Sequence, residues 1–391
     1  MKIAIICFDF KKSNLRKQPW RYIYEIAKGL QAKGHDVFIL TNSNGEADIA
    51  GIRVVGVSRL FIPLKGEPRE VLDVLERESP DKVIMLLGLT SFLRTQFRIK
   101  QPTIGILTSP IYSLRELIGN VGLKDLIRYR KYTVVHIINS LVPNFLVRKW
   151  SRKFEHIIVL SQRNRERLIK KGVPDEKVVV IHPGIDEDFL ELLDEERVNR
   201  IKSDIGEDKT PIVMYYTSPL TLRGTDTLVM ALPYVLKRKS IKLIILSRPD
   251  YKSVLKEEEK LKKLAKKLNV EGNLIIISRY LSPEEVKAYV GSADVVALPF
   301  KLVLSDVPLS ILEAMALGKL VISTDVDGIP EILEGKGLVV RPNNPKELAD
   351  AILLALENEE LRKELGKNAT KYLLRWKRWK DVVEEFSKLL G

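Results

Sequence analysis

Short runs of β-branched and other apolar residues recur along the whole chain, and most of them are apolar at consecutive positions. Strands buried on both faces of a parallel sheet show this pattern, because neither face of such a sheet meets water. The runs predict strands at residues 3–8, 37–41, 53–57, 83–87, 103–108, 156–161 and 178–182, and in the second half at 212–217, 242–247, 274–278, 294–299, 320–324 and 338–341.

Between these runs, apolar residues recur at helical spacing. The pattern predicts helices at residues 20–33, 71–78, 162–171, 226–237, 256–268, 283–290 and 309–317. Strands that alternate with helices form parallel sheets through right-handed crossovers. The fold class is therefore α/β, with doubly wound, Rossmann-like sheets.

A polar and acidic stretch at residues 184–211 separates two such series of strands. It predicts an N-terminal Rossmann-like domain at residues 1–185 and a second one at 186–370. The last residues, 371–391, belong to a predicted helix at 368–390, with Trp376 and Trp379, that packs across both domains. Because ligands of open α/β sheets bind beyond the carboxyl ends of the strands, we expect the site in the cleft between the domains.

The composition narrows the class of protein. Of 391 residues, 45% are hydrophobic, which excludes global disorder, and the single cysteine, Cys7, excludes a disulfide scaffold and a cysteine-based zinc cluster. No stretch offers the roughly 20 apolar residues of a membrane span. The apolar run at the N-terminus is too short for a signal peptide, so we expect a cytoplasmic location.

The net charge of +14 is concentrated in one segment. Residues 90–153 hold 12 lysines and arginines against Glu116 and Asp125 alone. Such a segment attracts nucleic acid, an acidic lipid surface or an anionic substrate. Nucleic acid is excluded as a partner, because the sequence has no recognised binding motif and no series of stacking aromatic residues.

The basic residues of this segment flank an apolar stretch, as they do in helices that lie on membranes. This arrangement predicts peripheral contact with an anionic membrane surface, on the inner face of the cell membrane; an ordinary solvated helix pair is the alternative. The residues of this predicted anion patch are Lys124, Arg128, Arg130, Lys131, Arg148, Lys149, Arg152 and Lys153.

The stretch 293–333 carries the first chemical signal. A strand is followed by a loop, and Pro308 then opens a helix that stops at Gly318. The free amides at Leu309 and Ser310, and the next one at 311, form an anion site suited to a phosphate. Glu313 lies one turn further in an otherwise apolar helix, and a buried carboxylate needs partners. Ribose hydroxyls and a buried salt bridge are the two alternatives.

A second signal lies at residues 212–229. A strand ends at Thr217, a short loop carries Arg223 and Gly224, and a helix begins near Thr225. A cation just before a helix N-terminus can complete a diphosphate site, although an ordinary loop arginine is equally consistent. The absence of a G-x-G-x-x-G motif and of a Walker A sequence disfavours a dinucleotide dehydrogenase and a P-loop NTPase.

At this point the sequence resembles the retaining glycosyltransferases of family 4, which have the two-domain GT-B fold. The resemblance covers nearly the whole chain and is strongest at HIIVLSQRNRERLIKKGVPDEKVVVIHPGID (156–186), LRGTDTLVMAL (222–232) and LEAMALGKLVISTDVDGIPEIL (312–333). It implies a nucleotide-sugar donor in the C-terminal domain. Glu313 matches the second Glu of the E-x7-E motif, which binds the ribose, and Arg223 matches a lysine that contacts the diphosphate.

The resemblance also implies a retaining reaction that needs no metal and no resident cofactor, and an acceptor that is a glycan or is lipid-linked. It implies further donor contacts from the strand end before Arg223, from the loop that lines the base and from the first turn of the Glu313 helix. These residues are Thr217, Ser218, Arg279, Tyr280, Leu281, Pro308, Leu309 and Ser310.

The sequence departs from the family pattern at several positions. Ser305 stands where the first Glu of E-x7-E is expected, so Asp306 beside it is the candidate substitute, and these two residues join Arg223 as the predicted catalytic set. Ser218 stands at the usual arginine, for which Arg248 or Arg163 can supply a cation. The N-terminal Gly-rich loop is replaced by FKKSNLRKQPW (10–20). The predicted acceptor-side residues are Trp20, Arg21, and Thr108 and Ser109 at the place of a usual histidine.

Three functions follow. The first is an active glycosyltransferase of the hexosyltransferase type. The departures also allow a partner subunit that binds the donor without turning it over. A sugar-nucleotide epimerase or phosphorylase is disfavoured, because no catalytic histidine–carboxylate set or cofactor lysine is evident.

Overall fold

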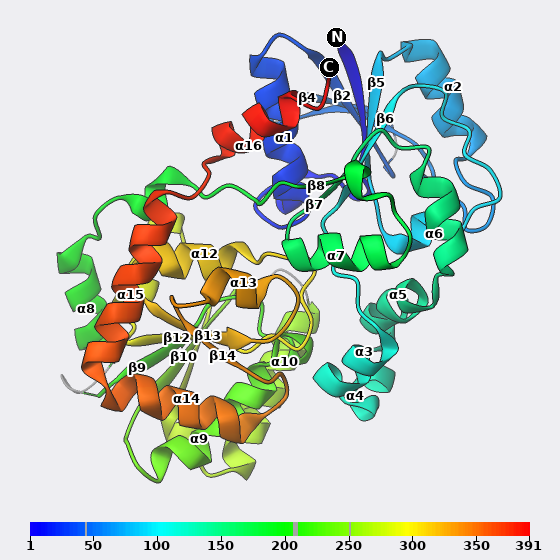
Figure 1. Ribbon diagram of the computed structural model, residues 1–391. Helices are drawn as coiled ribbons and strands as arrows, with labels where there is room; N and C mark the ends of the chain where they lie inside the picture. Colours follow the sequence, from blue (N-terminus) through cyan, green and yellow to red (C-terminus); the bar gives the residue numbers. More distant parts are fainter. Residues whose placement is uncertain (44, 206–209, 250–251) are drawn as a thin grey trace.

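A computed structural model describes residues 1–43, 45–205, 210–249 and 252–391. It has two α/β domains joined by two chain segments that run side by side (Figure 1). Residues 206–209 of the predicted boundary stretch lie outside the described residues.

The N-terminal domain is built on a sheet with the strand order β3-β4-β2-β1-β5-β6-β7-β8. All neighbours are parallel except β3 and β4, which pair antiparallel. Strand β3 was not predicted, because it is short and polar. The strands are β1 Lys2–Ile6, β2 Asp36–Thr41, β3 Glu46–Ile49, β4 Ile52–Gly56, β5 Lys82–Leu86, β6 Thr103–Leu107, β7 Ile157–Val159 and β8 Val178–Val180.

Helices cover both faces of this sheet, and four consecutive helices form an excursion between β6 and β7. Figure 1 shows this helical excursion, α3–α6, projecting beside the second domain. The helices of the N-terminal domain are α1 Trp20–Ala32, α2 Arg69–Glu78, α3 Leu114–Val121, α4 Leu123–Arg128, α5 Arg130–Leu141, α6 Asn144–Ser151 and α7 Gln162–Lys170.

The C-terminal sheet has the strand order β11-β10-β9-β12-β13-β14, and all of its neighbours are parallel. The order reverses between β9 and β12, which is where open α/β sheets bind ligands. The strands are β9 Ile212–Tyr215, β10 Lys242–Ser247, β11 Leu274–Ser278, β12 Val295–Leu298, β13 Leu320–Thr324 and β14 Leu338–Val340.

Four helices of the C-terminal domain were predicted, at residues 226–237, 256–268, 283–290 and 309–317, and the structure adds further helices that the pattern did not predict. The bounds of the helices in this domain are α8 Glu195–Ile205, α9 Thr225–Leu236, α10 Lys252–Lys267, α11 Pro283–Ser292, α12 Leu309–Ala316, α13 Ile329–Leu333, α14 Pro345–Glu357 and α15 Glu359–Leu374. Helix α8 lies within the predicted boundary stretch and packs against α11, so it belongs to this domain.

The predicted single helix at 368–390 is wrong, because two helices occupy this segment. Helix α15 ends at Leu374 and α16 runs from Trp379 to Ser387. The chain between them returns to the N-terminal domain beside the first crossing: the Ile185 amide donates to the Lys377 carbonyl at 3.1 Å. A Cβ atom on Gly184 would lie 2.6 Å from the Trp379 nitrogen, so glycine permits this close approach.

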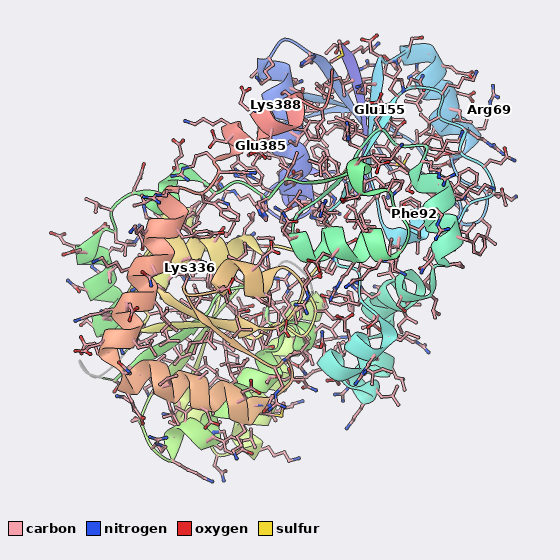
Figure 2. The ribbon with its side chains drawn as sticks, in the orientation of Figure 1. Arg69, Phe92, Glu155, Lys336, Glu385 and Lys388 are labelled. Atoms are coloured by element: carbon pink, nitrogen blue, oxygen red, sulfur yellow. The ribbon has the colours of Figure 1, made fainter. Side chains whose placement is uncertain are left out.

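Helix α16 packs against α1 and so fixes the end of the chain to the N-terminal domain (Figure 1). The Lys82 ammonium group donates to the Leu390 carbonyl at 2.8 Å and lies 3.0 Å from the Glu155 carboxylate. Figure 2 shows Glu155, Glu385 of α16 and Lys388, which directly follows α16, on the N-terminal side of the molecule. The two crossings therefore act as one connection between the domains.

Candidate active site in the interdomain cleft

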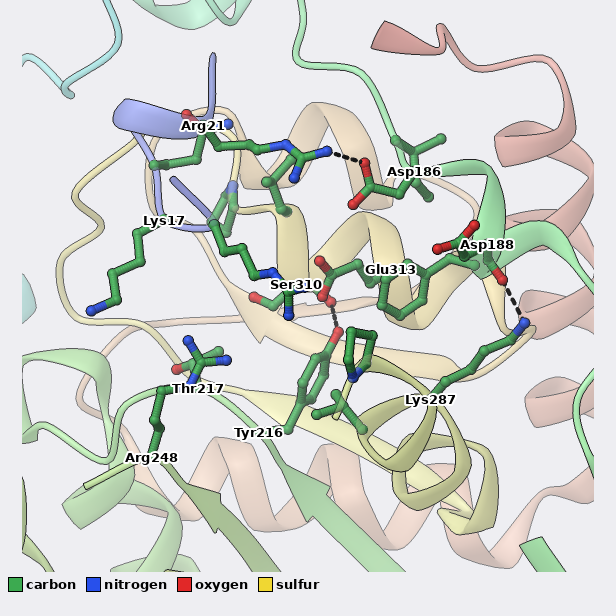
Figure 3. Close-up of a pocket in the computed structure, with 18 of the residues that line it drawn as sticks. Lys17, Arg21, Asp186, Asp188, Tyr216, Thr217, Arg248, Lys287, Ser310 and Glu313 are labelled. Carbon is green, nitrogen blue, oxygen red and sulfur yellow. Dashed lines mark hydrogen bonds and ion pairs between the residues drawn. The ribbon is translucent and has the colours of Figure 1, made fainter. Parts of the chain in front are cut away.

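A cavity of about 770 Å³ lies between the domains, at the carboxyl ends of the C-terminal strands. One wall is formed by the loop before α1, the opposite wall by the ends of β9, β10 and β11, and the floor by the first turns of α12 (Figure 3). The crossing segment at 185–191 closes one side. The predicted position of the site, in the cleft, agrees with this geometry.

Helix α12 aims its N-terminus into the cleft, where Pro308, Leu309 and Ser310 line the cavity. The amides of a first helical turn have no intrahelical acceptor, so they can bind an anion. The amide of Ile311 is an exception to the sequence expectation, because it donates to the Pro308 carbonyl at 3.1 Å. The available amides are therefore those of Leu309 and Ser310.

Glu313 lies one turn along α12, and its carboxylate faces the same cavity (Figure 3). Burial, together with the negative charge of Asp186, raises the pKa of Glu313 to about 7 against the opposing effect of Arg21. No ion pair of Glu313 with a lysine or arginine is seen among the described residues. The salt-bridge alternative for this carboxylate therefore finds no support in the structure.

Tyr216, which follows β9, connects the strand end to α12. Its hydroxyl donates to the Ser310 carbonyl and lies beside the Glu313 carboxylate. Burial raises the pKa of Tyr216 well above its ordinary value, so the phenol stays neutral and able to donate. The sequence analysis did not single out Tyr216, because it lies within the predicted buried strand at 212–217 and nothing distinguishes it there from a core residue.

Arg223 lines the cavity at the start of α9, as predicted. Its position depends on Gly224, which has φ of 80° and whose Cβ atom would lie 1.7 Å from the Pro299 carbonyl oxygen. Only glycine allows the end of β12 to approach this loop so closely. Thr217 and Ser218 line the cavity beside it, and the Tyr215 hydroxyl holds their loop by donating to the Ser218 carbonyl at 2.9 Å.

Of the two cations considered as replacements at Ser218, Arg248 lies in the cleft and Arg163 does not. Arg248 follows β10 and lines the cavity near Thr217 (Figure 3). Arg163 on α7 is engaged instead with Asp325, at 2.6 Å, in the contact between the domains. Arg223 and Arg248 thus place two guanidinium groups on one wall.

The loop after β11 reaches the cleft with two of its three predicted residues. Arg279 and Leu281 line the cavity, and Arg279 is paired with Glu285 at 2.8 Å. Tyr280 is 64% exposed and does not line it. The expectation that Tyr280 contacts the donor is therefore not met by this arrangement.

The N-terminal wall is formed by the loop at 16–18 and by the first residues of α1. Arg21 contacts Asp186 of the crossing segment at 2.7 Å, and the Trp20 indole donates to the Phe8 carbonyl at 2.7 Å. Gln18 lines the same wall, and its buried amide has no hydrogen-bond partner among the described residues. Trp20 and Arg21 were predicted here, whereas Gln18 was missed, because a lone glutamine carries no sequence signal.

Ser305 and Asp306 point in different directions. Ser305 lines the cavity, and its buried hydroxyl has no hydrogen-bond partner in the described part of the chain. Asp306 is fully buried outside the cavity, and its carboxylate accepts from the Gly328 amide at 3.0 Å. The proposed substitution of Asp306 for the missing glutamate is thus contradicted by its orientation.

Thr108 and Ser109 are also outside the cleft. The Thr108 carbonyl accepts from the Asp306 amide at 2.8 Å, and the Ser109 carbonyl accepts from the Asn164 side chain at 3.2 Å. Thr108 therefore helps to join the domains, whereas Ser109 makes its contact within the N-terminal domain. Neither residue lines the cavity, so their predicted place on its acceptor side is wrong. The end of β6 is covered by the contact with the C-terminal domain, which sequence alone does not show.

The eight residues of the predicted anion patch are all exposed on the helical excursion or just after it. None of them lines the cleft cavity. Within the described ranges no helix is both long and apolar enough to cross a bilayer, and no group of three or more histidine, cysteine or carboxylate side chains has the arrangement of a metal site.

Two family models match the chain, one in each domain. The Glycosyl transferase 4-like domain matches residues 19–184, and Glycosyl transferases group 1 matches residues 197–372. The chain is a group 1 glycosyltransferase by family and has the GT-B fold.

The relatives found by sequence comparison are distant. An uncharacterised glycosyltransferase of Methanocaldococcus jannaschii is 27% identical over 59% of this chain and 58% of its own length. The D-inositol 3-phosphate glycosyltransferase of Corynebacterium glutamicum is 25% identical over 94% of this chain and 90% of its own. The match to the first of these spans little more than half of that relative.

Solved structures agree in fold. Anabaena HepE in complex with UDP superposes with a TM-score of 0.74 at 16% identity, covering 100% of this chain and 99% of that one. Sucrose-phosphate synthase from Thermosynechococcus elongatus gives a TM-score of 0.74 at 18% identity, covering 100% and 98%. At such identities the likeness shows the GT-B fold alone.

Proposed function

We propose that this protein transfers a sugar from a nucleotide-sugar donor to a glycan or lipid-linked acceptor. The observation that carries the proposal is the convergence of Glu313, Arg223 and the first amides of α12 on one cavity at the switch point of the C-terminal sheet. These groups offer a carboxylate for hydroxyls and positive charge for phosphates, at the two ends of a site that fits a nucleoside diphosphate.

The donor is held, in this proposal, along the C-terminal wall. The Glu313 carboxylate accepts from the two ribose hydroxyls, and the Leu309 and Ser310 amides bind phosphate oxygens. Arg223 and Arg248 bind the diphosphate from the opposite side, and Arg279 and Leu281 lie beside the base. Anabaena HepE, solved in complex with UDP, is a protein of the same fold that holds such a nucleotide.

The reaction that we propose retains the anomeric configuration and needs no metal. The diphosphate leaves from the face of the sugar that the acceptor hydroxyl attacks, so the bond to the leaving oxygen breaks as the new glycosidic bond forms. The acceptor proton passes to the departing phosphate oxygen. The protein positions the two reactants and stabilises the charge that develops on the diphosphate, which is the work of Arg223, Arg248 and the helix amides.

The acceptor enters from the N-terminal wall, where Gln18, Trp20 and Arg21 face the donor residues. A relative from Campylobacter jejuni, 26% identical over 63% of this chain and 62% of its own length, is named for a diphospho-undecaprenol acceptor. A lipid-linked acceptor implies work at a membrane surface, so we propose a cytoplasmic protein that associates peripherally with the inner face of the cell membrane.

A second candidate function is a donor-binding partner subunit without turnover. It is favoured by Ser305 at the position of a family glutamate and by the absence of an acceptor-side histidine from the cavity lining that the structure describes. The two candidates make the same prediction for donor binding and opposite predictions for turnover by the purified chain.

The decisive experiment combines calorimetric binding and turnover. Sugar nucleotides and free nucleoside diphosphates are titrated into the wild-type chain and into Glu313→Ala, with Glu359→Ala on the exposed start of α15 as the matched control. Saturable binding that Glu313→Ala weakens and Glu359→Ala leaves unchanged supports the site. Failure of every common donor to bind contradicts it.

Turnover is then measured with the purified chain and a membrane extract as acceptor source. NMR of the product reports the anomeric configuration, and a chelator series reports any need for metal. Donor binding without transfer or hydrolysis favours the inactive partner subunit. Inversion of the anomeric centre, or loss of activity on chelation, contradicts the proposed mechanism.

A further inference from the structure

Helix α5 of the helical excursion buries polar residues, whereas an amphipathic helix on a protein surface usually buries its apolar residues. Its buried residues are Thr133, His136 and Asn139, which recur every three positions on one face. The Thr133 hydroxyl donates to the Leu126 carbonyl at 2.9 Å, and the Asn139 side-chain oxygen accepts from the Thr90 amide at 2.8 Å. The polar face is therefore specifically anchored to the protein.

The third residue of this inward face is a histidine that carries no charge. His136 packs edge-on against the Tyr112 ring, with 5.6 Å between ring centroids, and burial lowers its pKa to about 4. These contacts fix the rotation of α5 about its own axis. They therefore also fix which of its residues face outward.

That outward face is apolar. Val134, Ile138 and Leu141 follow each other at spacings of four and three residues, which aligns them along one side of α5, and Phe145 lies in the first turn of α6. They are 46%, 41%, 60% and 68% exposed, respectively. Surface helices normally turn such a stripe toward the core.

Helices α3 and α4, which pack against α5, also expose apolar residues. Leu123 and Ile127 of α4 are 62% and 65% exposed, and Ile118 of α3 is 49% exposed. Single exposed apolar residues are ordinary on protein surfaces, whereas contiguous groups of them mark contacts with proteins or membranes. We call these seven residues the apolar face of the excursion.

The same helices carry cations without counter-charges. Lys124, Arg128, Arg130 and Lys131 are exposed, and none of the ion pairs seen among the described residues includes them. The two acidic residues of the excursion are used elsewhere: Glu116 pairs with Arg167, and Asp125 lies 3.6 Å from the buried Lys301. The surface around the apolar face is therefore strongly positive.

We propose that the apolar face of the excursion inserts into the interface of a bilayer that contains anionic lipid. A bilayer supplies acyl chains for the apolar face and phosphates for the surrounding cations, whereas a second copy of this chain would bring like charges together. Only the role of this membrane contact, which is to bring the cleft to a lipid-linked acceptor, rests on the proposed function. The surface and its charge are independent of the transfer reaction.

The excursion and the segment just before it also contact the C-terminal domain. The Tyr112 hydroxyl accepts from the Val303 amide at 3.1 Å, and Lys301 bridges Asp125 of the excursion and Asp226 of α9. Val303 is itself a cavity-lining residue. The base of the excursion is therefore connected directly to a wall of the cleft.

Vesicle flotation of the full chain tests the proposal. Vesicles of phosphatidylcholine are compared with vesicles that also contain phosphatidylglycerol, at low and high salt. The apolar variant carries Val134→Ser, Ile138→Ser and Leu141→Ser. The matched control carries Leu354→Ser and Leu374→Ser, at exposed positions of the C-terminal domain that are 47% and 58% exposed. Circular dichroism and thermal unfolding verify that each variant is folded.

We expect wild-type binding that requires phosphatidylglycerol and weakens with salt, because exposed charges are screened within about 10 Å at 0.1 M ionic strength. The apolar variant should bind at least tenfold more weakly, while the control binds normally. A second variant, with Lys124, Arg128, Arg130 and Lys131 changed to serine, should lose the preference for anionic lipid while its apolar face stays intact.

Three results overturn the proposal: no binding to anionic vesicles, binding that the apolar variant retains, or a solution dimer that the apolar variant abolishes in the absence of vesicle binding. Donor affinity is measured in the same samples by calorimetry. Normal donor binding by a variant that has lost vesicle binding separates failure of the surface from failure of the proposed function.

Discussion

The Tyr129 hydroxyl, in the N-terminal domain, donates to the Thr221 hydroxyl, in the C-terminal domain, across 2.8 Å. Thr221 in turn donates to the Glu257 carboxylate of α10 at 2.7 Å. Thr221 lies two residues before Arg223, in the short turn that ends at Gly224. The helical excursion is thus connected by hydrogen bonds to the loop that carries a cation of the cleft.

Tyr129→Phe should weaken use of the donor without unfolding the protein. The variant keeps the ring and loses one hydrogen bond, and such a bond contributes about 0.5–1.5 kcal/mol, so we expect kcat/KM for the donor to fall about two- to tenfold. Tyr132→Phe, on an exposed position of the same excursion, is the control. Equal kinetics for the two variants would show that this contact does not position Arg223.

Arg223→Ala and Arg248→Ala should each lower kcat/KM for the donor by about ten- to hundredfold, because a hydrogen bond to a charged group contributes about 1.5–3 kcal/mol. Arg223→Lys should recover part of the loss, since it keeps the charge but not the bidentate geometry. Arg238→Ala, which removes only an exposed pair with Glu357, serves as the control. Wild-type kinetics for Arg248→Ala would remove it from the diphosphate site.

Donor affinity should depend on pH through Glu313. Its pKa of about 7 in the free protein means that protons compete with the donor below that pH. A carboxylate that accepts from two ribose hydroxyls must be ionised, so the dissociation constant should rise as pH falls below about 7, approaching tenfold per pH unit. The charged groups that act on Glu313 are Asp186, Arg21 and Arg248.

Calorimetry with an intact sugar nucleotide measures this dependence, because its phosphates carry no second proton that titrates near neutrality. Glu313→Gln should bind the donor more weakly and with no comparable change between pH 6 and pH 8, values set about one unit either side of the pKa. A wild-type affinity independent of pH would show that the carboxylate does not contact the donor.

Asp306→Asn should leave donor kinetics within about twofold of the wild type, because the side chain lies outside the cleft, and it should change stability instead. Burial raises the pKa of Asp306 to about 6 and that of Asp327, to which Asp306 adds its negative charge, well above its ordinary value. The folded chain then holds protons that the unfolded chain releases, so the free energy of unfolding falls as pH rises from about 4 through 6.

Asp306→Asn removes one of these titrating groups, so the free energy of unfolding of the variant should depend less steeply on pH than that of the wild type. Urea unfolding at several pH values measures it, and Ser305→Ala, at the adjacent position that does line the cleft, is the comparison for kinetics. A large kinetic defect in Asp306→Asn with normal Ser305→Ala kinetics would reverse the assignment and return Asp306 to the active site.

The sequence predicted the lining of the C-terminal wall of the cavity better than that of the N-terminal wall. Glu313, Arg223 and the amides before them follow strand ends within single strand–turn–helix units, so local pattern fixes where they point. Thr108 also follows a strand end, but the C-terminal domain covers that end, and its carbonyl accepts from the Asp306 amide. Contacts made between domains leave no periodic signal in either segment.

The helical excursion shows the same limit in another form. Its charge was evident from composition, since 12 basic residues stand against two acidic ones at residues 90–153. The burial of the polar side of α5 was not, because Val134 and His136 are equally compatible with an inward position until the partners of Thr133 and Asn139 are known.

The sequence by itself determined the two-domain parallel α/β architecture, the family and the strand ends and helix start that line the C-terminal wall of the cleft. Local apolar spacing and the positions of glycine and proline indicate buried strands and helix starts. Only the tertiary structure decided that Ser305 faces the cleft while Asp306 faces the other domain, that Arg248 joins Arg223, and that α5 turns its apolar side outward. Those outcomes depend on contacts between segments that are far apart in the sequence. Packing and the need to satisfy buried polar groups decide which of these contacts form.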